Sequence, residues 1–390
     1  MKKYMKTIIV LALIIGSFGT YYVYSISAQS ANPEIAIETV SGDESMLDRI
    51  LIQGGYNSGF NYMSFVLDES GATFQNDLNF LERMDGIYQT TKKRLEKEYK
   101  SFMRGKEVYH DNIYEDDDHL VVVSEDLYRS VNQDYKLTAS FLDKETEEEF
   151  NTEVSFPVSS YDYMRILDVQ MNDGLIQIFT QAWANGMERS YPEVHVLEIN
   201  PTNEEMIGHR VILSGDGEEI EEGANVDLTI LGDSVSWVAN EFVVFRQQTH
   251  QWNENVDYPE EGPAGLYAYD LAARDLKKLE IPEPFGNRTV DAFDGTNLYF
   301  YEESGNQLNM KVYNLHEEQF VEDLTLETGG EPFYPTLMFD GNLYGIQRID
   351  EEFHLFVFDQ ADGSKMYEGK IEVEDDVEIE DLYFDGIVVK

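Results

Sequence analysis

The sequence predicts an all-β fold of the β-propeller class, with six or seven four-stranded blades, of which we prefer seven. Three observations support this prediction: one turn motif recurs along the chain, a second strand-and-turn motif follows it, and their common period approaches 45 residues. That period fits a blade of four short antiparallel strands. A β-sandwich is the competing fold, but six copies of one hairpin pair are difficult to place in it.

The first motif is a short turn between aromatic or branched runs. Asp-Gly is a strong hairpin signal because the turn needs positive φ, which glycine adopts at little cost. The copies are Asn172-Asp173-Gly174, Gly232-Asp233-Ser234, Phe293-Asp294-Gly295, Phe339-Asp340-Gly341 and Phe384-Asp385-Gly386. The aspartates of the last three copies are 46 and 45 residues apart.

The second motif is a strand that ends in a bulky residue, followed by an acid or amide and a polar turn. Its six copies end at Asp68, Asp143, Glu198, Asp270, Asn314 and Asp359. In the last two full copies the bulky residues Tyr313 and Phe358 follow the aspartate of the first motif by 19 and 18 residues. Each unit therefore holds two hairpins, which gives four strands.

These units resemble the blades of bacterial extracytoplasmic β-propellers of the WD40-like or YVTN-like type, over Met46 to Lys390. The resemblance is architectural, because the sequence holds neither a Trp-Asp dipeptide nor a kelch Gly-Gly signature. It therefore implies a fold but no functional residues. We expect the C-terminal strand pair around Asp385-Gly386 to be completed by an N-terminal strand at Ile35–Val40, which would close a ring of seven blades.

The N-terminal segment predicts export. Residues 1–33 are expected to be a signal or membrane anchor with a short linker, and residues 34–390 the propeller domain. Three lysines within the first six residues precede Thr7–Ile26, an uncharged stretch long enough for a helix that crosses a bilayer of ~30 Å. Alternatively, the small residues of Ala28–Ala31 offer a cleavage site. The protein is thus predicted to be extracytoplasmic, either single-pass and outside-facing in the cell membrane or secreted.

Composition excludes several classes of function. The 390 residues include 76 acids, 28 bases and no cysteine, with a net charge of −48. Sites that need a thiol are therefore excluded, and so is a phosphate-tracking nucleic-acid surface. Export without cysteine is ordinary for a Gram-positive bacterium. Removing the three N-terminal lysines leaves 76 acids against 25 bases, a net of −51, which we interpret as an adaptation to a salty or alkaline medium.

One basic segment, at residues 90–106, interrupts the repeat. It holds seven of the 28 bases, and Leu95, Tyr99, Phe102 and Met103 have helical spacing. We expect a short helical insertion between the first two blades. It is either a solvated charged face or a cationic site for anionic wall polymer or lipid headgroups.

Two insertions and one acidic link predict a binding surface. Strand parity places the segments Gln181–Glu193, Arg246–Ala264 and Ser214–Asn225 on one face of neighbouring blades. Long loops on a rigid scaffold often carry binding residues. The predicted ligand-binding residues are Trp183, Arg189, Tyr191, Arg246, Trp252 and Tyr258. The alternative is that these loops only pack on each other.

Catalytic and metal signals are weak. Gly232-Asp233-Ser234 resembles the nucleophile block of lipase-like serine hydrolases, but no Asp-x-x-His follows it, and the turn motif already explains it. Acid clusters suggest calcium, with Asp116, Asp117 and Asp118 as candidate ligands, yet no EF-hand spacing is present. No other cofactor is expected.

Two functions remain open from the sequence. The first is a non-catalytic exported propeller, anchored or secreted, that binds a membrane or cell-wall protein or a wall polymer. The alternative is an extracellular propeller enzyme, a glycan or ester hydrolase, that uses carboxylates inside the channel. Propellers host both roles, so the fold cannot choose between them.

Overall fold

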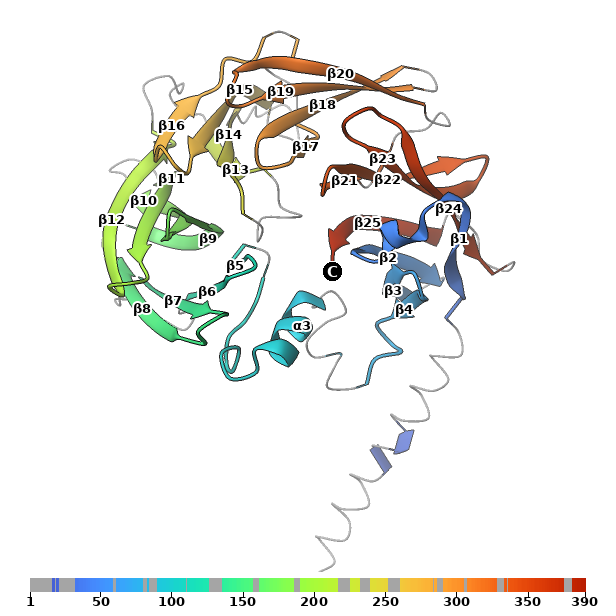
Figure 1. Ribbon diagram of the computed structural model, residues 1–390, viewed down its shortest axis with the longest axis horizontal. Coiled ribbons are helices and arrows are strands. Elements are labelled where there is room, and N and C mark those ends of the chain that lie inside the picture. The colour runs from blue at the N-terminus through green and yellow to red at the C-terminus, as the bar shows by residue number, and fades with distance from the viewer. Residues whose placement is uncertain are drawn as a thin grey trace, which may run out of the picture.

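The computed structural model describes residues 16–17, 19–20, 32–58, 61–79, 83, 90–109, 111–125, 135–156, 161–185, 190–216, 225–231, 239–251, 260–282, 284–285, 290–304, 307–327, 333–334, 336–374 and 381–390. They form six antiparallel sheets arranged around one axis, a β-propeller (Figure 1). The all-β propeller is therefore confirmed. The division at residue 33 stays a prediction, and no helix among the described residues is long and apolar enough to cross a membrane.

We number the blades I to VI and give their strands from the axis outward. Blade I consists of β25 (Leu382–Val389), β2 (Ile50–Ser58), β3 (Asn61–Asp68) and β4 (Gly71–Phe74). Blade II consists of β5 (Ile113–Glu115), β6 (His119–Glu125), β7 (Tyr135–Asp143) and β8 (Glu149–Phe156). Blade III consists of β9 (Tyr161–Asn172), β10 (Leu175–Asn185), β11 (Ser190–Asn200) and β12 (Glu205–Ser214).

The remaining blades follow the same order. Blade IV consists of β13 (Asn225–Ile230), β14 (Phe242–Gln251), β15 (Glu260–Asp270) and β16 (Asp275–Lys278). Blade V consists of β17 (Ala292–Phe293), β18 (Asn297–Ser304), β19 (Gln307–Asn314) and β20 (Gln319–Glu327). Blade VI consists of β21 (Thr336–Phe339), β22 (Asn342–Ile349), β23 (Glu352–Asp359), β24 (Lys365–Val373) and β1 (Ile35–Gly42).

The ring closes between the two ends of the chain, but not as expected. The C-terminal segment is one strand, β25, which pairs with β2 and becomes the innermost strand of blade I. The predicted turn at Asp385-Gly386 is instead a bulge, because Gly386 pairs with Gln53 and Phe384 with Gly54. Strand β1 pairs with β24 as a fifth, outermost strand of blade VI. The preference for seven blades is thus corrected to six in the described residues.

The turn motifs have a local physical cause. Asp173-Gly174 and Asp340-Gly341 have positive φ at both residues, as a tight hairpin turn requires. At the outer hairpins the acid or amide accepts backbone hydrogen bonds: the Asp270 Oδ1 accepts from Ala272 and Ala273 at 2.9 and 2.7 Å. The copy assigned to Glu198 is shifted by two residues, since Asn200 accepts the turn N–H of Thr202. The Gly232-Asp233-Ser234 turn lies outside the described residues.

Among the described residues, apolar clusters join every pair of neighbouring blades except blades I and II. Five of them lie between the sheets of neighbouring blades, where alternate residues of each strand are buried. The sixth cluster belongs to the predicted basic insertion, in which Thr90–Glu98 forms the helix α3. Leu95, Phe102 and Met103 are buried there against blade II, and α3 lies beside that blade in Figure 1. A 3-10 helix, η1 (Glu44–Leu47), connects β1 to β2.

Candidate functional site

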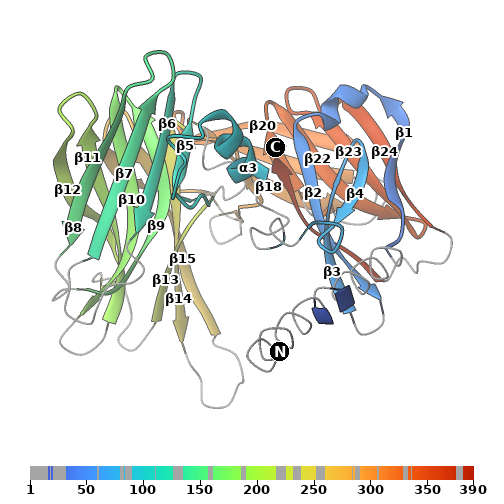
Figure 2. The ribbon, with the colours of Figure 1, turned by 90° about the horizontal axis from the view of Figure 1, so that it is seen from below.

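The propeller has two different faces. Each innermost strand follows a link from the previous blade, so the innermost strands all start on the same face. We call this the link face; it also carries the connections between the second and third strands of every blade. The opposite, turn face carries the short hairpin turns. Figure 2 shows the ring from the side, with the hairpin of β14 and β15 reaching farther than the neighbouring strands toward the link face.

The predicted binding segments belong largely to strands and not to loops. Trp183 lies in β10 opposite Pro192, and Tyr191 lies in β11 opposite Ala184, so this insertion is a long hairpin. Arg246 lies in the middle of β14, between Thr229 and Leu266. The expected loop Arg246–Ala264 is therefore corrected: Arg246–Gln251 belongs to β14 and Glu260–Ala264 to β15, and the residues between them lie outside the described part of the chain. Arg189, Trp252 and Tyr258 lie outside the described residues.

A small polar and aromatic patch lies at the link-face end of blade III. Tyr163 pairs with Trp183 across β9 and β10, and Arg165 pairs with Gln181 two residues further along. The two aromatic rings are tilted by 59°, with centroids 5.6 Å apart. The Arg165 Nε donates to Gln181 Oε1 at 2.9 Å. We call these four residues the blade III patch.

Blade IV holds the blade III patch in position. Gln181 is buried, and its Nε2 donates at 2.9 Å to the carbonyl oxygen of Leu228 in β13. Tyr163, in contrast, is half exposed, at 51% of its surface. A fixed amide thus lies beside an aromatic pair of which Tyr163 is exposed. Sequence reasoning found Trp183 but missed Tyr163 and Arg165, although the alternation Tyr161, Tyr163, Arg165 was visible.

Two histidines and an acidic side chain lie together on β11 and β12 of the same blade. The His195 Nδ1 is 3.0 Å from His209 Nε2, and His195 Nε2 is 3.3 Å from Glu193 Oε2. Burial, and then the neighbouring His209, lower the pKa of His195 to about 4. Burial, and then the charge of Asp216, raise the pKa of Glu193. His195 is therefore neutral at pH 7, and the carboxylates beside it keep a negative field.

The calcium candidates of blade II include a carboxylate with structural partners. Both oxygens of Asp116 are already used: Oδ1 accepts the backbone N–H groups of Asp118 and His119, and Oδ2 accepts the Tyr114 hydroxyl at 2.8 Å. Asp116 is thus the cap of a tight turn. In the described part of the chain, no three His, Cys, Asp or Glu side chains are grouped to hold a metal. Calcium at Asp116, Asp117 and Asp118 stays a prediction from the sequence.

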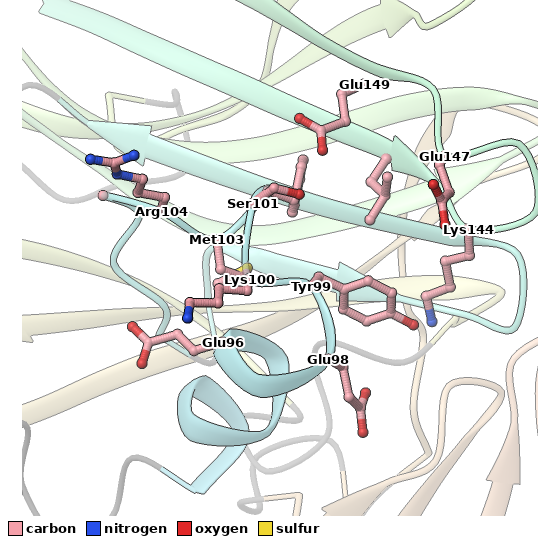
Figure 3. A pocket seen from close by; sticks show the side chains of 13 residues that line it. Glu96, Glu98, Tyr99, Lys100, Ser101, Met103, Arg104, Lys144, Glu147 and Glu149 are labelled. Atoms are coloured by element: carbon pink, nitrogen blue, oxygen red, sulfur yellow. The ribbon is translucent and has the colours of Figure 1, made fainter.

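The basic insertion borders a hollow of about 1000 Å³ between α3 and blade II (Figure 3). Its charged lining residues are Lys100, Arg104, Lys144, Glu96, Glu98, Glu147 and Glu149. Lys144 is itself bound to Glu115 at 2.9 Å, and Arg94 holds the same carboxylate. The hollow has mixed charge, so its lining does not favour the anionic ligand considered from the sequence.

The comparisons with known proteins concern the fold. No family model and no curated protein matches the chain. TolB from Acinetobacter baumannii is 12% identical, over 88% of this chain and 67% of that one, with a TM-score of 0.33. The polysaccharide lyase Uly1 is 12% identical over 66% and 57%, with a TM-score of 0.38. A prolyl endopeptidase is 10% identical over 86% and 42%, with a TM-score of 0.35. None of these similarities assigns a function to this chain.

Proposed function

We propose that this protein is an exported propeller without a catalytic centre, which binds a protein partner or a cell-wall-associated ligand on its link face. The observation that carries the proposal is the Tyr163–Trp183 pair of the blade III patch, in which Tyr163 is half exposed. Tyr163 lies against a partly buried Trp183, so half of its surface faces solvent and adds nothing to the core. Such residues are frequent anchors at binding surfaces because they offer a large contact area.

The alternative, an enzyme that uses carboxylates of the innermost strands, has less support. Arg94 and Lys144 bind Glu115 in β5. Gln170 and Val169 donate to the buried Asp168 in β9. These two carboxylates already have structural partners. A paired carboxylate is a poor general acid or base, since its partners must first be displaced.

Export and membrane attachment belong to the same proposal. Their support is the basic N-terminus followed by the uncharged stretch Thr7–Ile26. We infer that the propeller faces the outside and meets its ligand within or next to the cell envelope.

Photo-crosslinking in the living cell tests the proposed face. A photoreactive residue at Tyr191, beside the blade III patch, is expected to form an adduct, whereas one at Val321 on β20 is not. In the double variant Tyr163→Ala/Trp183→Ala the adduct at Tyr191 should fall at least tenfold, because the aromatic contact area is lost. Circular dichroism should show unchanged folding. An equal adduct in the double variant would overturn the proposal.

A further inference from the structure

The hollow between α3 and blade II has two walls from separate parts of the chain (Figure 3). One wall is the C-terminal end of α3 with the turns that follow it, residues 96–105. The other is the outer hairpin of blade II, residues 142–149. The buried Phe102 and Met103 hold the first wall against that blade. Because the hairpin turn belongs to the turn face, the hollow lies away from the link face.

Most charged side chains of this hollow are left unpaired by the fold. Five of them form no ion pair with any residue in the described part of the chain: Glu96, Lys100, Arg104, Glu147 and Glu149. The other two have partners, since Lys144 binds Glu115 at 2.9 Å and Glu98 binds Arg94 at 3.2 Å. Charged groups of both signs are therefore open to a ligand in the same hollow.

The unpaired charges of opposite sign lie apart. In Figure 3, Lys100 and Arg104 are on one side of the hollow and Glu147 is on the other, with Glu149 between them at the top of the view. Glu96 precedes Lys100 by one helical turn and offsets part of its charge, so Arg104 is the main cation of its side. The hollow thus has a cationic side and an anionic side.

The size of the hollow suits a short peptide. Its volume of about 1000 Å³ equals that of a sphere about 12 Å across, and four residues of extended chain span about 13 Å. A single amino acid spans only about 3.5 Å. Only a ligand of several residues can therefore reach both charged sides with its two ends.

We propose that this hollow binds a short peptide with free ends, its carboxylate toward Arg104 and its ammonium toward Glu147 and Glu149. A guanidinium donates two parallel hydrogen bonds to a carboxylate, and an ammonium offers three donors to carboxylate oxygens. Lys106 lies near Glu149, but its Nζ donates to the carbonyl oxygen of Phe102 and forms no ion pair with that acid. The site is separate from the link face and does not depend on the function proposed above.

A ligand with charges of only one sign fits the two walls less well. An anionic polymer would place some of its groups beside Glu147 and Glu149, and a polyamine would place an ammonium beside Arg104 and Lys100. The protein's net charge of −48 attracts cations, but it acts on a ligand through the ligand's own net charge. That charge is zero for a peptide with two free ends, so the local arrangement decides its binding.

Calorimetric titration of the full-length protein with tetra-alanine tests the ligand class. N-acetyl-tetra-alanine lacks the ammonium, and tetra-alanine amide lacks the carboxylate, so each of these probes keeps one charge. We expect tetra-alanine to bind at least fivefold more tightly than either, because each loses one charge-assisted contact. Phosphocholine, a zwitterion with the chemistry of a lipid headgroup, is the fourth probe and should not bind.

Charge-removing variants assign each end of the peptide to its wall. Arg104→Gln should weaken tetra-alanine binding at least fivefold but should not weaken binding of the amide, which has no carboxylate. Glu147→Gln/Glu149→Gln should weaken tetra-alanine equally but not N-acetyl-tetra-alanine. Lys97→Gln on α3 and Glu145→Gln in the turn after β7 remove charges outside the lining and are the matched controls. Circular dichroism should show the same fold in all variants.

Four results would overturn the proposal. They are no binding of tetra-alanine, equal binding of all three peptides, an equal loss of affinity in the control variants, and binding of phosphocholine in place of tetra-alanine, which would assign a lipid headgroup. The adduct at Tyr191 on the link face should be as strong in Arg104→Gln as in the wild type. A failure of the peptide site therefore leaves the function proposed above intact.

Discussion

At the scale of single residues, several polar side chains are fixed by burial and not by solvent. His195 is fully buried between Tyr161, Glu193 and His209, and burial keeps it neutral. The sequence showed only a histidine in a strand and gave no reason to expect a partner. The contact with His209 arises between β11 and β12, 14 residues apart, and depends on a bulge in their pairing.

Acid should destabilise the fold through His195. Its folded-state pKa is lowered, to about 4, so the unfolded chain takes up the proton first as the pH falls below ~6.5. The stability that comes from keeping His195 neutral is fully present above pH ~6.5 and is lost as the pH falls toward 4. Between pH 7 and 4.5 the wild type should lose about 2 kcal/mol more than His195→Gln. Urea unfolding of the wild type and His195→Gln at pH 7, 5.5 and 4.5 measures this difference in unfolding free energy. Parallel pH profiles for the two proteins would contradict the prediction.

At the scale of elements, the turns were predictable because their cause is local. The oxygen of an acid or amide at the end of the third strand accepts N–H groups two and three residues ahead. Strand lengths were less predictable. The segments around Trp183 and Arg246 look like loops because they are polar, yet cross-strand pairing extends them as hairpins.

Removal of one turn cap should lower the free energy of unfolding by a measurable amount. Asp270→Ala deletes the acceptor for Ala272 and Ala273, and we expect about 1 kcal/mol of lost unfolding free energy. Asp275→Ala removes an exposed carboxylate five residues away and is the matched control, with no expected change. Equal urea midpoints for the two variants would show that the cap is unimportant.

At the scale of the whole molecule, the net charge of −48 acts on a closed ring. Charges of the same sign repel each other across the surface without breaking any single contact. Salt of molar concentration reduces the range of this repulsion to about 3 Å.

Salt should therefore stabilise the protein. We expect the melting temperature to rise by several degrees between 20 mM and 1 M NaCl, because screening relieves repulsion in the folded state more than in the expanded chain. Differential scanning calorimetry measures the shift, with sucrose of equal osmolality as the control. A melting temperature that falls over this range is the contrary result.

The repeat, the four-stranded unit, the turns and the helical insertion could be predicted from the amino-acid sequence. All of these depend on residues close together in the chain, where alternation, turn chemistry and helical spacing are visible. The six blades and the pairing of β25 with β2 became known only from the three-dimensional structure. The same holds for the meeting of Tyr163 with Trp183 across β9 and β10. Those arrangements join segments up to hundreds of residues apart, and they depend on sheet register and ring closure, which no local pattern encodes.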